Sequence, residues 1–268
     1  LHCSVHSFPT RRSSDLLGPA EEWLIAEYRK APVRHADETG WRNDGLNSYA
    51  WLFATGTISL YRFRNTRAGI VAREVFGDLT LPGVLLVDRY IGYNGLPVSI
   101  QYCYAHLLRH VEDIQAEFPQ DPEVVAFTSS LAAALSEAMS LRREVPRRTP
   151  YLRKAAALKA RILRIVNADA RHPGVQNIQS IFRENSGRLY HWVEGPEIPA
   201  DNNFAERSLR PTVIARKLSF GSQSDRGMHT REILMSVIGT LAKRFTDPWQ
   251  ALKRALDGIT AAIHAGVT

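Results

Sequence analysis

Three carboxylates are the residues of this sequence best suited to chemistry. Asp37 lies in a predicted strand, Asp88 directly follows the apolar run Val84–Val87, and Glu206 lies in a predicted helix. Carboxylates held a few ångströms apart repel one another, and a divalent ion with a preference for oxygen ligands, such as Mg²⁺ or Mn²⁺, relieves that repulsion. Two such ions about 3.5–4 Å apart can activate an attacking oxygen and stabilise a leaving oxygen. The trio is therefore suited to metal-dependent phosphoryl transfer.

Each of these carboxylates also has a simpler interpretation. An aspartate at the end of a strand is commonly a turn or capping residue. Glu206 could pair with Arg210 one helical turn later. Glu38 competes with Asp37 for the role of first ligand, although neighbouring residues of a strand point to opposite faces. Spacing and chemistry therefore make the trio plausible without selecting it.

Five predicted strands set the fold class. Aromatic and apolar alternation predicts strands at Val33–Trp41, Tyr49–Thr55 and Ile58–Arg64, which read as an antiparallel meander. The short apolar run Val84–Val87, bounded by turn residues, is typical of a strand buried on both faces, and Val98–Tyr102 predicts another. This order predicts an α/β protein with a ribonuclease-H-like mixed sheet, in which the first strand neighbours the fourth and Asp37 faces Asp88.

Helical periodicity accounts for most of the remaining chain. The helix at Thr230–Phe245 is expected to turn Ile233, Leu234, Val237, Ile238 and Leu241 toward the core, and Pro211 is expected to interrupt or kink the helix that carries Glu206. The predicted helices are Pro19–Lys30, Arg67–Phe76, Tyr104–Glu117, Pro122–Arg143, Tyr151–Asp169, Asn202–Leu218, Thr230–Phe245 and Trp249–His264.

Composition narrows the class of protein. The 268 residues include 34 basic and 27 acidic side chains, a net charge of +7 that favours a polyanionic partner. Two cysteines exclude a disulfide framework and a four-cysteine zinc site. No apolar run reaches the ~18 residues of a membrane span, so we expect a cytoplasmic protein with no membrane association.

Basic residues are concentrated between positions 142 and 171. This stretch contains ten basic residues and only two acidic ones. Its excess of eight positive charges is larger than the net charge of the whole chain. A solvated helical face accounts for part of the excess, and we interpret the stretch as a surface for the DNA backbone. The residues assigned to that contact are Arg147, Arg148, Arg153 and Lys154.

Leu1–Leu16 is set apart from the rest of the chain. Its segment His6–Leu16 matches one reading frame of a common sequencing adapter, so we expect residues 1–16 to be non-native and exclude them from the fold, with a genuine disordered tail as the alternative. The expected organisation is then residues 17–118 as the first part of a catalytic core, 119–190 as a helical insertion, and 191–268 as the catalytic helix with the C-terminal helices.

Five segments in order resemble the transposases of the insertion-sequence sixty-six family. They are His35–Arg42, Val87–Asn94, Cys103–Arg109, Asp201–Pro211 and Arg216–Ser222. The resemblance covers nearly everything from Leu17 onward and implies a DDE transposase with a ribonuclease-H-like core. It also implies that Asp37, Asp88 and Glu206 are the metal-binding catalytic residues, with two Mg²⁺ or Mn²⁺ ions. The implied reaction is hydrolysis at the ends of a DNA element, followed by attack of the freed 3′ hydroxyls on target DNA.

The resemblance extends to the partners and to supporting residues. Cys103 and His106 match a recurring element of the family, and a supporting role is preferred to zinc because no second Cys/His pair is evident. Joining two DNA ends in one event implies a homo-oligomer on DNA, with helper proteins as possible partners.

Family members carry N-terminal DNA-binding segments, which implies that this chain is a fragment. The basic residues that follow the glutamate and would meet phosphates are Arg207, Arg210, Arg216 and Lys217.

Two other functions compete with transposition. A nuclease of the same fold would keep the carboxylates and metals without strand transfer. An inactive transposase fragment would bind DNA through its basic insertion without cutting it.

Overall fold

The computed structural model describes residues 17–264, with side chains described to residue 258. These residues form two compact units, each treated separately below. The first unit contains the described residues up to Leu81, the short segment Gly95–Pro97, and the residues from Ala205 onward. The second unit contains Pro82–Asn94 and Val98–Phe204. The expected non-native stretch, residues 1–16, lies outside the described residues.

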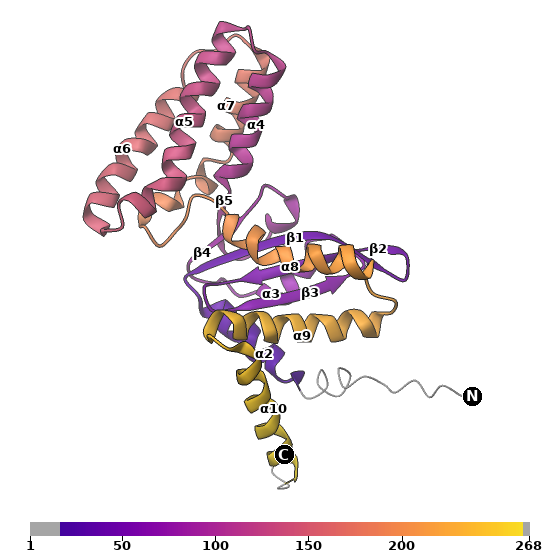
Figure 1. The fold of residues 1–268 in the computed structure, drawn as a ribbon. Coiled ribbons are helices and arrows are strands. Elements are labelled where there is room, and N and C mark those ends of the chain that lie inside the picture. The colour runs from indigo at the N-terminus through magenta and orange to yellow at the C-terminus, as the bar shows by residue number, and fades with distance from the viewer. Residues whose placement is uncertain (1–16, 265–268) are drawn as a thin grey trace. The chain divides into compact units, whose positions relative to one another are not determined.

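An antiparallel meander forms the centre of the first unit (Figure 1). Strands β1 (Val33–Asn43), β2 (Leu46–Ala54) and β3 (Ser59–Arg64) pair in chain order, which confirms the predicted meander. Asp44 and Gly45 join β1 to β2 with φ angles of 49° and 75°. A two-residue turn with both φ angles positive matches the twist of the flanking strands, and Asp-Gly is a favoured pair for it.

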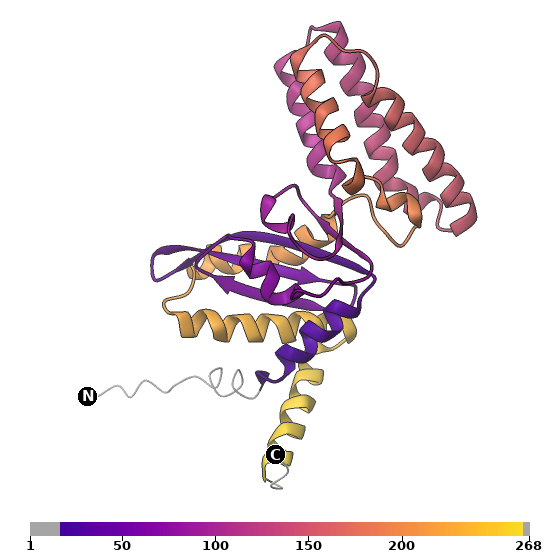
Figure 2. The ribbon, with the colours of Figure 1, turned by 180° about the vertical axis from the view of Figure 1, so that it is seen from behind.

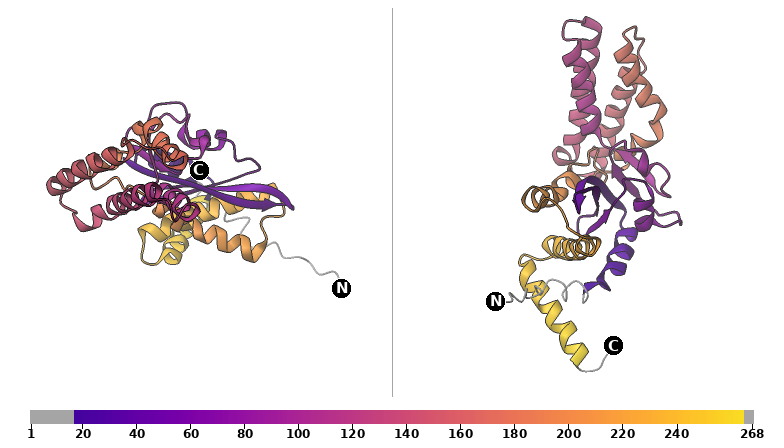
Figure 3. Two further views of the ribbon diagram at one scale, coloured as in Figure 1. Left: turned by 90° about the horizontal axis from the view of Figure 1, so that it is seen from above. Right: turned by 90° about the vertical axis from the view of Figure 1, so that its right-hand side faces the viewer.

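The two faces of the meander are covered by different helices. Tyr28 of α2 (Ala20–Lys30) and Phe76 of α3 (Ile70–Phe76) pack edge-on against each other, and both contact Phe53 of β2. The opposite face is covered by α8 (Asn203–Ser219), where the Tyr61 hydroxyl donates to the Ser208 carbonyl over 2.9 Å. Figures 2 and 3 show α3 and α8 on opposite sides of these strands. Strand β2 is consequently buried on both faces from Ala50 to Ala54.

Polar side chains of α9 (Asp225–Arg244) accept hydrogen bonds from the backbone N–H groups along the outer edge of β3. Backbone N–H groups at alternate positions of the strand meet side-chain oxygens four residues apart on the helix. Two residues of strand span about 6.8 Å and four residues of helix about 6 Å, so the two repeats match. The pairs are Ser59 with Thr240 (3.0 Å), Tyr61 with Ser236 (2.8 Å) and Phe63 with Glu232 (2.8 Å). The helix thereby blocks an edge that would otherwise pair with another chain.

The buried face of α9 differs from the predicted one. Of the five apolar residues expected to face the core, only Ile233 is buried, and the other four are half-buried. Glu232, Ser236 and Thr240 are buried instead. The prediction was wrong because apolar periodicity identifies a helix that packs on a sheet face, whereas α9 lies along a strand edge whose donors require acceptors.

Four helices and two strands make up most of the second unit. Strands β4 (Val84–Val87) and β5 (Ser99–Tyr102) pair in parallel, with Val84 opposite Ser99 and Val87 opposite Tyr102. The chain therefore contains antiparallel and parallel strand pairs together with helices, which confirms the α/β class. The helices are α4 (Tyr104–Glu117), α5 (Pro122–Glu144), α6 (Arg148–Val166) and α7 (Pro173–Glu184), and the shorter 3₁₀ turns are η1 (Ile91–Tyr93), η2 (Ser186–Arg188) and η3 (His191–Glu194).

Helix α7 was missing from the sequence-based prediction. Its start is marked by His172, whose ring accepts the Gly174 N–H, and by Pro173 in the first turn. Apolar residues at helical spacing form its buried face, namely Val175, Ile178, Ile181 and Phe182. Both signals were present in the sequence.

Helix α5 is long and apolar enough to cross a membrane by length and composition alone. In the structure it packs against α4, α6 and α7. Its buried residues include Val124, Leu131 and Leu135, which lie on one face at helical spacing. Packing inside the helical unit therefore accounts for the apolar character of α5.

The C-terminal helices extend the first unit. Helix α8 continues past Pro211 to Ser219, and α10 (Pro248–His264) contacts α9. Pro211 is exposed. A proline inside a helix removes one backbone hydrogen bond, which is least costly where water can reach the carbonyl left without its donor.

Candidate active site

Asp37 lies half-buried in the middle of β1. The three residues before it, Arg34 to Ala36, are buried, so Asp37 is the first residue of β1 after this buried stretch that is partly exposed. One carboxylate oxygen of Asp37 accepts the Glu38 N–H over 2.9 Å. The side chain is therefore held at the border between the core and solvent.

The strand register places Asp37 on the sheet face that α8 covers. Residues directly opposite each other in antiparallel strands point to the same face. Asp37 is opposite Leu52 of β2, and Leu52 is opposite Tyr61 of β3. Tyr61 donates to the Ser208 carbonyl of α8, two residues beyond Glu206. Asp37 and the helix that carries Glu206 thus lie on one side of the meander.

Glu38 points away from that face and is engaged elsewhere. Its carboxylate accepts from Arg67 Nε over 3.0 Å and from Arg67 Nη2 over 2.6 Å. The Glu38 side chain is only 2% exposed, whereas that of Arg67 is 46% exposed. Alternation along β1 therefore gives two adjacent acids different surroundings.

Asp88 follows the last residue of β4, as the sequence predicts. It is half-buried, and one of its carboxylate oxygens accepts the Tyr90 N–H over 2.9 Å. This is the turn-forming role that aspartates commonly adopt after a strand. The bond also fixes the orientation of the carboxylate at the carboxyl end of a buried strand, where ligands bind in open α/β sheets.

Glu206 lies in the first turn of α8 and is half-buried. The Asp201 side chain accepts the Asn203 N–H over 3.0 Å at the start of the helix. The helix begins one residue later than predicted. Carboxylates in a first turn are stabilised by the helix dipole.

Cys103 anchors the segment that precedes α8. Its buried Sγ accepts the Asn202 N–H over 3.1 Å, and the next residue, Tyr104, donates its N–H to the Ala200 carbonyl over 2.9 Å. Two of the recurring segments, those that begin at Cys103 and at Asp201, are thus bonded to each other. His106 is half-buried in the first turn of α4.

Burial raises the pKa of the Cys103 thiol to about 11. In the unfolded chain a thiol titrates near 8.5, so burial favours the protonated form, and its stabilising contribution is complete below about pH 8.5 and lost as pH rises through about 11. We expect alkylation of Cys103 by iodoacetamide at pH 8 to be about a hundredfold or more slower in the folded protein than in urea, because the thiolate is the nucleophile. Peptide mapping by mass spectrometry reads Cys103 separately from Cys3. Equal rates in the two states would contradict this assignment.

The segment after α8 ties this helix to the end of β1. Ser222 exchanges backbone hydrogen bonds of 2.8 Å with Arg42 and Asp44, and its hydroxyl accepts the Trp41 indole N–H over 3.2 Å. Gly221 has a φ of 119°, and a Cβ there would lie 2.2 Å from the Arg42 carbonyl oxygen. Only glycine fits so close an approach. The fifth recurring segment therefore acts as a clamp between α8 and β1, a role that the sequence did not indicate.

The predicted DNA-binding side chains have different surroundings. Arg216 belongs to the clamp, since its guanidinium donates to the Gly40 carbonyl and approaches the Thr39 hydroxyl at 3.4 Å. Arg148 pairs with Glu197 over 2.7 Å and bonds the Glu194 carbonyl over 3.0 Å. The remaining six are exposed: Arg207, Arg210 and Lys217 on α8, and Arg147, Arg153 and Lys154 at the start of α6.

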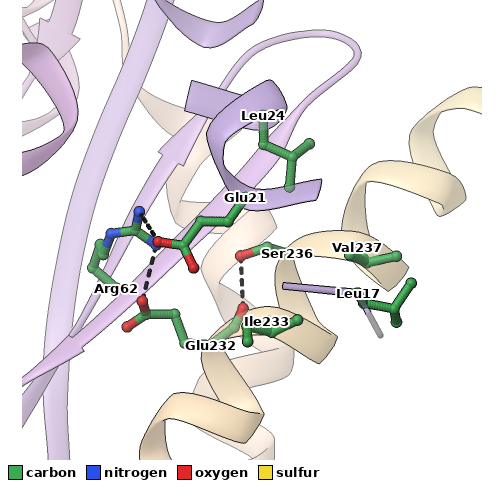
Figure 4. Close-up of a pocket in the computed structure, with 8 residues that line it drawn as sticks. All are labelled: Leu17, Glu21, Leu24, Arg62, Glu232, Ile233, Ser236 and Val237. Atoms are coloured by element: carbon green, nitrogen blue, oxygen red, sulfur yellow. Dashed lines mark hydrogen bonds and ion pairs between the residues drawn. The ribbon is translucent and has the colours of Figure 1, made fainter. Parts of the chain in front are cut away.

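Glu21, His229 and Glu232 form a cluster in the first unit, with their ligand atoms within 4.8 Å of one another. Figure 4 shows that Arg62 lies between the two glutamates, with ion pairs of 2.7 Å to Glu21 and 2.9 Å to Glu232. Arg64 adds a third ion pair, of 2.7 Å, to Glu232. Arginines therefore supply the positive charge in this cluster, and the pocket lined by Glu21, Arg62 and Glu232 is too small to admit a water molecule. We assign it to folding rather than to metal binding.

Comparison with known proteins gives one family and several relatives. The family model described as "Transposase IS66 family" matches residues 7–230. The chain is 26% identical over 231 residues to the uncharacterized protein y4jD of Sinorhizobium fredii (strain NBRC 101917 / NGR234), which covers 75% of this chain and 42% of that protein. It is also 26% identical over 275 residues to y4qI of the same strain, with 89% and 50% covered. The chain thus spans about half the length of these relatives.

Proposed function

This chain belongs to the IS66 transposase family, and from that premise we propose that it carries the catalytic centre of a DDE-type DNA transposase. In this proposal Asp37, Asp88 and Glu206 together hold divalent metal ions within a ribonuclease-H-like core. Residues 119–190 form a helical insertion between the second and third carboxylates. The protein cuts the ends of a DNA element and joins the freed 3′ hydroxyls to target DNA, without a covalent enzyme intermediate.

The observation that carries this proposal is the sheet face shared by Asp37 and α8. Tyr61 lies across the strands from Asp37 and bonds the backbone of α8 at Ser208, two residues beyond Glu206. The clamp at Ser222 holds the other end of α8 to β1. Two separate attachments thus fix the helix of one proposed ligand to the strand of another.

The donor set fits hard divalent cations. All three residues are half-buried carboxylates, and carboxylate oxygens are the ligands that Mg²⁺ and Mn²⁺ prefer. Bound at these residues, two such ions would supply activation of the attacking oxygen and stabilisation of the leaving oxygen.

The basic side chains of each unit would bind the DNA backbone. The exposed Arg207, Arg210 and Lys217 follow the proposed ligand on α8, and arginine and lysine bind phosphates through charge and hydrogen bonds. In the second unit, Arg147, Arg153 and Lys154 offer the same chemistry. Since two DNA ends are joined in one event, we propose that the protein acts as a homo-oligomer on DNA.

Asp88→Asn tests the proposal. The change keeps an acceptor for the Tyr90 N–H but removes the charge, so we expect loss of Mn²⁺-supported nicking of supercoiled plasmid with nearly unchanged DNA affinity. Asp78→Asn, at an exposed residue of the first unit, is the matched control and should behave as wild type. Nicking by Asp88→Asn at the wild-type rate would refute the metal-binding role.

The products of the wild-type protein separate transposition from its two competitors. A transposase joins a labelled 3′ end to the plasmid, which gives a slower-migrating labelled band on a denaturing gel. Cleavage without any joined product would indicate a nuclease of the same fold. DNA binding without cleavage would indicate an inactive fragment.

A further inference from the structure

Phe220 is an aromatic side chain displayed on the surface between α8 and α9. It is 83% exposed, and its backbone has a φ of 56°. Left-handed backbone is unfavourable for a bulky L-residue, and such positions concentrate at functional sites. Asp44, the other described non-glycine residue with positive φ, lies in a tight turn that favours it. Phe220 directly follows the end of α8, where left-handed backbone is common but the residue is usually glycine or asparagine, so a phenylalanine there is unusual.

The backbone around Phe220 is held firmly. The Phe220 N–H donates to the Arg216 carbonyl over 2.9 Å, and the Ser219 hydroxyl donates to the Gly221 carbonyl over 3.2 Å. Directly after it, Gly221 and Ser222 form the clamp on β1. The segment is therefore ordered before any ligand binds, while the phenyl ring remains in solvent.

Exposed cations and a further exposed apolar side chain lie on the segments next to Phe220. Leu218 is 77% exposed, and Lys217 is exposed beside it in the chain. Arg42 and Arg226, on the segments joined by the clamp, are also exposed. The acids of these segments are Asp44 and Asp225, and Asp225 accepts a hydrogen bond of 2.6 Å from Asn43. An exposed aromatic ring close to cations can bind nucleic acid. The ring can stack on the flat apolar face of a base, and the cations can bind the neighbouring phosphates.

We propose that Phe220 is a wedge that stacks on a base of bound DNA, with Lys217 and Arg226 on the adjacent phosphates. Proteins that kink or open a duplex insert apolar side chains between base steps in this way. The inference rests on the proposed function, since it takes DNA as the ligand. Phe220 follows Glu206 by 14 residues, so at about 1.5 Å per helical residue the wedge lies roughly 21 Å, or about six base pairs, from the proposed site of cutting.

Binding to a 30-base-pair fluorescein-labelled duplex, measured by anisotropy, tests the wedge. Phe220→Ala should weaken the affinity about tenfold, within the range for base–aromatic stacking. The slope of affinity against salt should stay unchanged, because no charge is lost, whereas Lys217→Ala should lower that slope by about one. Phe245→Ala is the matched control, since Phe245 is 51% exposed and lies beyond the opposite end of α9.

Base unstacking provides a second readout that a structural role would not change. A 2-aminopurine placed in the duplex should brighten when wild type binds and stay dim with Phe220→Ala. Phe220→Asn, which tolerates left-handed backbone, should behave like Phe220→Ala. Thermal unfolding of both variants should match wild type, because the ring is exposed.

The outcomes distinguish this inference from the proposed function. Wild-type affinity and brightening in Phe220→Ala, with DNA binding intact, would overturn the wedge alone. Failure of wild type to bind DNA would overturn both. A change in the sedimentation coefficient of Phe220→Ala without DNA, at wild-type DNA affinity, would assign Phe220 to contact with a second copy and also overturn the wedge.

Discussion

Asp37→Asn is expected to lower metal-dependent DNA cleavage by about a thousandfold or more, equivalent to about 4 kcal/mol of transition-state stabilisation. Asparagine keeps the shape of the side chain and can still accept the Glu38 N–H. It removes the negative charge that the metal ions require, so the loss should fall on the chemical step. Plasmid nicking with Mn²⁺, at protein concentrations that saturate the DNA, measures this effect separately from binding.

Glu38→Gln is the matched control for Asp37→Asn, because the two acids are adjacent in the sequence. Glu38 lies on the opposite face and pairs with Arg67, so its loss should cost about 1 kcal/mol of stability and leave cleavage within a fewfold of wild type. The opposite pattern, with cleavage lost in Glu38→Gln and retained in Asp37→Asn, would make Glu38 the first ligand. It would also require a different register of β1.

Glu232→Ala is expected to lower the free energy of unfolding of the first unit by about 3–5 kcal/mol, the usual loss when one partner of a buried ion pair is removed. The Glu232 side chain is 2% exposed and accepts from Arg62, from Arg64 and from the backbone of β3 at Phe63. Without it, the Arg62 guanidinium, whose side chain is 3% exposed, keeps its ion pair with Glu21 and its hydrogen bond to the Tyr61 carbonyl but loses its second carboxylate partner. Urea unfolding followed by tryptophan fluorescence measures this loss.

Glu74→Gln is the control for this network. Glu74 also pairs with Arg64, over 2.6 Å, but its side chain is 36% exposed. Exposed pairs contribute about 0–1 kcal/mol, so this variant should unfold close to wild type. If Glu232→Ala lost no more stability than Glu74→Gln, the polar edge of β3 would not depend on the glutamate.

Local patterns in the sequence were sufficient to predict most elements. Alternation along residues 33–64 predicted the three strands, because it depends only on neighbouring residues. The carboxylate after the apolar run Val84–Val87 was identified in the same way. The family was recognised from five short segments, and the family comparison confirms it.

Properties that depend on packing between distant segments could not be predicted from these patterns. Which face of α9 is buried was predicted wrongly, because the deciding factor is the row of N–H donors on β3, more than 160 residues earlier in the chain. The partners of Arg216 were missed for a similar reason, since arginine in a sequence does not indicate whether its guanidinium meets phosphate or a backbone carbonyl.

The same distinction between local patterns and long-range packing applies to the candidate site. The sequence by itself determined which acids are present and that alternation in β1 separates Asp37 from Glu38. Only the tertiary structure decided that α8 covers the face of Asp37 and that a clamp at Gly221 and Ser222 holds it there. Side-chain identity and local periodicity are encoded residue by residue, whereas the register between elements far apart in the chain is set by hydrogen bonds and close contacts that form only on folding.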